Sequence, residues 1–63
     1  MRRAERLFRL VSLMRAERLS KAEDLAQSLE VSVRTIYRDI AHLQGSGVPI
    51  DGEAGVGYVL DQG

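Results

Sequence analysis

The sequence predicts a small, mainly α-helical fold in which three helices precede a short β-hairpin. Up to about residue 44, apolar residues recur at three- and four-residue steps, which is typical of amphipathic helices. After Gly47 the pattern changes to β-branched and aromatic stretches separated by glycines, which is typical of strands joined by a turn. We therefore expect residues 1–60 to form one domain and residues 61–63 to be a linker stub.

The first helix is expected over residues 1–18. Its apolar residues share one stripe, which should face the core: Ala4, Leu7, Phe8, Leu10, Val11, Leu13 and Met14. Its charged residues share the opposite side: Glu5, Arg6, Arg9 and Glu17. This first helix should therefore bury one face and expose the other.

Serines are expected to cap the next two helices. Ser20 and Glu23 have the spacing of a capping box, so a second helix is expected over residues 20–30. Ser32 should cap a third helix over residues 32–44, with Gly45 as its left-handed C-terminal cap. Each helix has an inward stripe: Ala22, Leu25, Ala26 and Leu29 in the second, and Val33, Ile36, Ile40 and Leu43 in the third.

The hairpin is expected over residues 48–60, with its turn at residues 52–55. Pro49 lacks a backbone N–H and should lie on an edge. The residues expected to face the helices are Val48, Ile50, Tyr58 and Leu60. The glycines of this segment have no nucleotide-binding spacing and no helix follows them, so we interpret them as turn residues of the hairpin.

Composition excludes several kinds of site. The chain has 63 residues, no cysteine and one histidine, so neither a disulfide nor a multi-histidine metal site is expected. We expect no cofactor, no metal, no catalytic residue and no small-molecule ligand in this segment. No apolar run reaches the roughly 20 residues of a membrane span. The expected location is the cytoplasm.

The net charge is zero, but the charged residues are unevenly distributed along the chain. Residues 1–44 hold nine basic and six acidic residues, a net of +3, whereas residues 45–63 hold three acidic residues, a net of −3. Charge alone does not distinguish a nucleic-acid face from chance segregation.

Two short helices joined by a turn of three or four residues match the spacing of a helix-turn-helix. The residues expected on the outer face or border of the third helix are Arg34, Thr35, Tyr37 and Arg38. Arginine forks bind guanine edges or phosphate, and threonine contacts thymine or backbone. Two arginines alone would indicate a solvated face; after a helix-turn-helix and before a hairpin they favour double-stranded DNA.

The stretch Arg34-Thr35-Ile36-Tyr37-Arg38-Asp39-Ile40, with Gly55-Val56-Gly57-Tyr58 about twenty residues later, resembles one bacterial family. It is similar to the N-terminal winged helix-turn-helix domain (HTH type 11, DeoR-like) of WYL-domain transcription regulators. The resemblance implies that the third helix reads DNA, that the hairpin is the wing and that a C-terminal regulatory domain follows. It implies DNA contacts at Ser32, Arg34, Thr35, Tyr37 and Arg38. We also expect a homodimer in the full-length protein, associated with the nucleoid when bound to DNA. This segment alone is either a dimer or a monomer whose dimerisation is supplied by the absent domain.

Further contacts are weighed against structural roles. Candidate phosphate contacts are Arg2, Arg3, Ser20 and Lys21. Asp39 is expected to hold an arginine or a backbone amide, and His42 to lie at the surface. The wing carries acidic residues, which leaves open both its contact with DNA and an alternative function as a protein-docking or autoinhibitory module.

Overall fold

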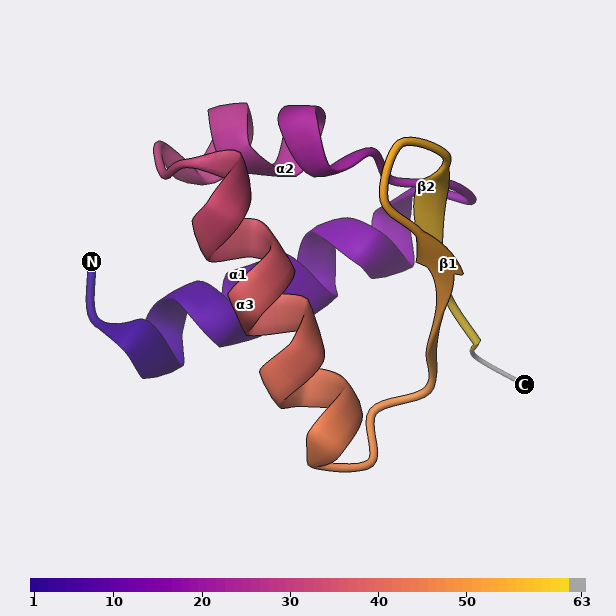
Figure 1. Ribbon diagram of the computed structural model, residues 1–63. Coiled ribbons are helices and arrows are strands. Elements are labelled where there is room, and N and C mark those ends of the chain that lie inside the picture. Colours follow the sequence, from indigo (N-terminus) through magenta and orange to yellow (C-terminus); the bar gives the residue numbers. More distant parts are fainter. Residues whose placement is uncertain (62–63) are drawn as a thin grey trace.

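The computed structural model describes residues 1–61, which form three helices followed by a two-stranded antiparallel hairpin (Figure 1). The elements are α1 (Arg3–Ala16), α2 (Ala22–Leu29), α3 (Val33–Gly45), β1 (Ile50–Glu53) and β2 (Gly57–Leu60). In Figure 1, α3 crosses α1, and the hairpin stands beside the end of α1. The predicted fold class, a winged helix-turn-helix, is confirmed. The predicted linker stub lies, except for Asp61, outside the described residues.

The core lies where the helices meet the hairpin. Leu10 and Met14 of α1 and Ile36 of α3 have the largest fully buried side chains in the described chain. The other core residues are Ala22, Leu25, Ala26, Leu29, Ile40, Leu43, Ile50, Tyr58 and Leu60. The inward stripes predicted for α2, α3 and the hairpin are therefore confirmed, with Val33 and Val48 half-buried. Each large apolar side chain buried here contributes roughly 1.5–3 kcal/mol, more than a typical surface contact.

The stripe predicted for α1 is too wide. Phe8 is 73% exposed and Ala4 is also exposed, because the rest of the fold covers only the side of α1 that carries Leu10 and Met14. Arg6, predicted on the outer side, is half-buried and points toward α3.

The capping box predicted at Ser20 is wrong. The N-cap of α2 is Lys21, and its side chain makes no capping hydrogen bond. Ser20 instead pairs with β2: its amide donates to the Tyr58 carbonyl at 2.8 Å, and the Tyr58 amide donates to the Ser20 carbonyl at 2.7 Å. Because β2 pairs with β1 on its other side, the wing is joined by backbone hydrogen bonds to the α1–α2 connection.

The C-terminal cap of α3 also lies later in the chain than predicted. Gly45 is still helical, Ser46 is the C-cap, and Gly47 carries the left-handed conformation with φ of 95°. Glycine is required again at Gly52, where a Cβ atom would lie 2.1 Å from the Gly57 carbonyl oxygen. The hairpin turn occupies residues 54–56, slightly later than predicted. Pro49 precedes β1, and its carbonyl accepts from the Asp61 amide at 2.8 Å.

Candidate nucleic-acid interface

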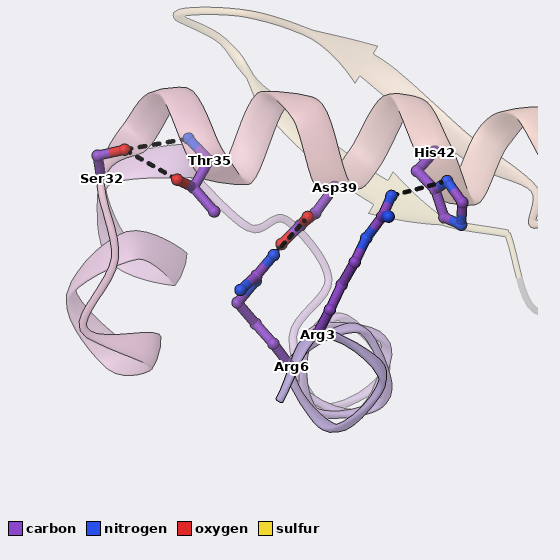
Figure 2. Close-up of polar contacts among 6 residues, drawn as sticks. All are labelled: Arg3, Arg6, Ser32, Thr35, Asp39 and His42. Atoms are coloured by element: carbon purple, nitrogen blue, oxygen red, sulfur yellow. Dashed lines mark hydrogen bonds and ion pairs between the residues drawn. The ribbon is translucent and has the colours of Figure 1, made fainter. Parts of the chain in front are cut away.

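The start of α3 is fixed by a tight turn and a serine cap. α2 ends at Leu29, and Glu30 takes a left-handed conformation with φ of 56°. Ser32 Oγ accepts from the Thr35 amide at 3.1 Å and lies 3.0 Å from Thr35 Oγ1 (Figure 2). The predicted turn of three or four residues is confirmed with three residues, 30–32, and the predicted cap is confirmed, so α3 leaves α2 in a defined direction.

The outer face of α3 carries two arginines. Arg34 and Arg38 are both exposed, whereas Ile36 and Ile40 of the same helix are buried. Residues four apart are neighbours on a helix surface, so the two guanidinium groups belong to one strip. Neither has a hydrogen-bond or ion-pair partner among residues 1–61. The strip therefore presents two unneutralised cations to solvent.

The inner face of α3 is braced against α1 by an ion pair. Arg6 Nε donates to Asp39 Oδ2 at 2.6 Å, and Arg6 Nη2 donates to Asp39 Oδ1 at 3.0 Å (Figure 2). The Asp39 side chain is 4% exposed and that of Arg6 is 19% exposed. The hydrogen bond to Asp39 raises the pKa of Arg6, against the opposing effect of burial. The structural role predicted for Asp39 is confirmed, and its carboxylate is turned away from the outer face of α3.

A second contact joins the same helices farther along. Arg3 Nη2 lies 3.1 Å from His42 Nδ1, and because arginine has no acceptor the guanidinium donates (Figure 2). Both residues are exposed, as predicted for His42. This contact places the Arg3 cation beside the C-terminal half of α3.

Tyr37 lies at the border between the outer face and the core. It is half-buried, and its ring meets Tyr58 edge to face, with ring centroids 6.4 Å apart and an interplanar angle of 60°. Burial raises the pKa of Tyr58, and the neighbouring Tyr37 raises it further. Thr35 is also half-buried. These contacts tie the exposed strip to the wing.

The remaining predicted residues divide by exposure. Arg2 and Lys21 are exposed, whereas Ser20 is 5% exposed and its Oγ has no hydrogen-bond partner in the described chain. Lys21 and the wing tip, residues 55–58, line one small hollow of about 40 Å³. The start of α2 and the wing therefore meet, and Lys21 rather than the Ser20 hydroxyl reaches the surface there. The wing acids Asp51 and Glu53 are exposed.

Neither a metal site nor a membrane-spanning helix is present in the part of the chain that the structure describes. It contains no group of three or more histidine, aspartate or glutamate side chains that could hold a metal ion. None of its helices is both long enough and apolar enough to cross a membrane.

Comparisons with known proteins agree with this geometry. Over 53 residues the chain is 45% identical to an uncharacterized HTH-type transcriptional regulator, YobV of Bacillus subtilis strain 168, and the match covers 84% of this chain but 17% of that protein. No solved structure is significantly similar to the chain. Residues 3–59 match the family described as HTH domain. The chain therefore belongs to the HTH domain family, here with a hairpin wing.

Proposed function

We propose that this chain binds double-stranded DNA sequence-specifically for transcription regulation, with α3 in the major groove. The observation that carries the proposal is the strip of Arg34 and Arg38, exposed and without partners among the described residues, on a helix that is capped at one end and braced from behind. A helix-turn-helix places the N-terminal part of its second helix against base edges, and these two arginines lie in that part of α3.

Each residue has a role in this proposal. Arg34 contacts a base edge, most favourably the O6 and N7 acceptors of guanine, and Arg38 contacts phosphate. Ser32, Thr35 and Tyr37 contact the same groove wall from the start and border of α3. Arg2, Arg3 and Lys21 contact phosphates on either side. The Ser20 hydroxyl is buried, so the predicted phosphate contact at the start of α2 is assigned to Lys21.

The wider setting is also part of the proposal. The relative's name supports transcription regulation, and the match to only 17% of that protein supports a longer protein. The resemblance of the Arg34–Ile40 and Gly55–Tyr58 stretches to WYL-domain and DeoR-like regulators supports a regulatory domain in it. We propose a cytoplasmic, non-enzymatic protein that binds as a homodimer to two half-sites. This segment would take neither a cofactor nor a small-molecule ligand.

The salt dependence of binding tests the proposal. Preferred duplexes are first selected from a random pool with the chain, and the selected duplex is then titrated at several salt concentrations. Four phosphate contacts per copy, from Arg2, Arg3, Lys21 and Arg38, would give a log–log slope of about −3.6 per copy, because each contact releases condensed counterions. Binding that is independent of salt, or equal for selected and scrambled duplexes, would contradict sequence-specific DNA binding.

A second function is favoured by the zero net charge and by the exposed acids of the wing. It is a protein-docking or autoinhibitory module of a longer protein. The double substitution Arg34→Glu and Arg38→Glu distinguishes the two functions. Loss of DNA binding and of reporter regulation supports the first, whereas unchanged regulation in cells supports the second.

A further inference from the structure

The surface between α1 and α2 is hollowed in two adjoining places. One hollow of about 320 Å³ includes Glu17, Ser20 and Asp24 in its lining, and one of about 250 Å³ includes Arg9. Both are lined by Leu13 and Ser28, so they form one continuous groove with these two residues at its middle. Arg34 and Arg38 line neither hollow, so the groove is separate from the strip proposed to bind DNA.

The two ends of this groove carry opposite charges. The carboxylates of Glu17 and Asp24 lie at one end and the guanidinium of Arg9 at the other. All three residues are exposed, and none has an ion-pair partner within residues 1–61. Arg9 and Ala16, the last residue of α1, are seven residues apart, about 10 Å along the helix, and Glu17 follows as the C-cap. The charges at the two ends of the groove do not neutralise each other, and the groove is complementary in charge to a second copy turned end for end.

The acidic end also contains an unsatisfied acceptor. Ser20 lines it, is 5% exposed and has an Oγ atom without a hydrogen-bond partner in the described chain. A buried hydroxyl without a partner is unfavourable by roughly 1–3 kcal/mol. A guanidinium carries five N–H donors, so one from outside can bind the two exposed carboxylates at this end, whereas the buried Ser20 hydroxyl lies out of its reach.

We propose that this groove is the surface through which two copies of the chain pair. A two-fold axis passes through the middle of the groove, at Leu13 and Ser28, and the Arg9 of each copy enters the acidic end of the other. The contact is isologous, so it closes at two copies. This deepens, and rests on, the proposed binding of a homodimer to two half-sites.

Such a pairing is weak without DNA. The floor of the groove is apolar, with Leu13, Leu25 and Leu29, but it is short, and interfaces below about 1,200 Å² form transient complexes. We therefore expect dissociation constants between about 10 μM and 1 mM for the free chain.

Cross-linking tests the position of the axis, because the chain has no cysteine of its own. Ser28→Cys places a thiol at the middle of the groove, and Ser46→Cys places one at an exposed serine outside it. A short bis-maleimide should link the Ser28→Cys chain to itself several-fold faster than the Ser46→Cys chain. Equal rates would overturn the proposed axis.

Charge reversal tests the proposed pairs by sedimentation equilibrium without DNA, up to about 1 mM chain. Arg9→Glu should lower the association constant at least about tenfold, and adding Glu17→Arg should restore most of it. Arg18→Glu, an equal charge change outside the groove, should leave the constant within about twofold. A wild-type chain that stays monomeric at 1 mM, or equal losses for Arg9→Glu and Arg18→Glu, would overturn the pairing. If that monomer still binds DNA with the expected salt slope, the proposed function stands without it.

Discussion

Arg34 and Lys21 carry the same charge in different settings. Arg34 lies on the outer face of α3, and Lys21 lies at the N-cap of α2 beside the wing. Arg34→Ala should weaken binding to the selected duplex by about 1–3 kcal/mol and remove the base preference at one position. Lys21→Ala should weaken all sequences alike and reduce the salt slope by about 1. The measurement is fluorescence anisotropy on a set of single-base variants, with Arg18→Ala as the exposed control. A uniform loss for Arg34→Ala would assign that residue to phosphate instead.

Asp39 contributes to stability rather than to binding. Its carboxylate is almost fully buried against Arg6, so Asp39→Asn leaves a partly buried guanidinium without its counter-charge. We expect a loss of about 1–3 kcal/mol in the free energy of unfolding, measured by urea denaturation with circular dichroism. Replacing both partners, with Arg6→Met and Asp39→Leu, should recover part of that loss, because no buried charge then remains. An unchanged urea midpoint for Asp39→Asn would show that the pair is not stabilising.

At the scale of elements, Ser20 precedes α2 and Ser32 precedes α3, but only Ser32 caps its helix with a side-chain hydrogen bond. Ser32→Ala removes the oxygen that accepts from the Thr35 amide, and we expect a loss of about 1 kcal/mol in unfolding free energy. Ser20→Ala removes a buried hydroxyl that has no partner in the described chain, so the free energy of unfolding should stay the same or rise, by up to about 1–3 kcal/mol. Thermal and urea unfolding of the two variants at low protein concentration compare them directly. A larger loss at Ser20 would contradict this assignment of the caps.

These serines also show what the sequence predicts well and what it does not. The cap at Ser32, the inward stripes and the exposed Arg34 and Arg38 follow from local periodicity and local hydrogen bonding, so they were predictable. Ser20 satisfies the same local pattern. Its amide and carbonyl are, however, occupied by a backbone bridge to Tyr58, which lies 38 residues later in the chain. A local sequence pattern cannot show that a strand 38 residues away competes with the helix cap for the backbone of Ser20.

The same limit applies to α1. Arg6 was predicted on the outer side because periodicity alone does not show which arc of a helix its neighbours cover. Its bond to Asp39 spans 33 residues of sequence, and the predicted partner of Asp39 was an arginine or a backbone amide at no stated position. Phe8 was predicted inside for its apolarity, although no other element covers that side of α1.

For the whole molecule, Tyr58 is the residue at which separate parts of the fold converge. Its backbone pairs with Ser20 of the α1–α2 connection and faces Gly52 of β1, and its ring packs against Tyr37 of α3. The wing is therefore held by backbone bonds on one side and by an aromatic contact on the other. Ionisation of the Tyr58 phenol should therefore change the free energy of unfolding of the whole domain.

The pKa of Tyr58 gives that change a direction. Burial, and then the neighbouring Tyr37, raise the pKa above its ordinary value of 10.0, so the folded state favours the protonated phenol. The resulting stability is fully present below pH 10 and is lost as the pH rises through the folded-state pKa. Urea unfolding of the wild type and of Tyr58→Phe between about pH 8 and pH 11.5 isolates this effect, because both proteins share every other titrating group. The difference between their unfolding free energies should be constant below pH 10 and should then shift against the wild type. Parallel curves across the whole range would mean that Tyr58 ionises as easily in the folded domain as in the unfolded chain, which would contradict the raised pKa.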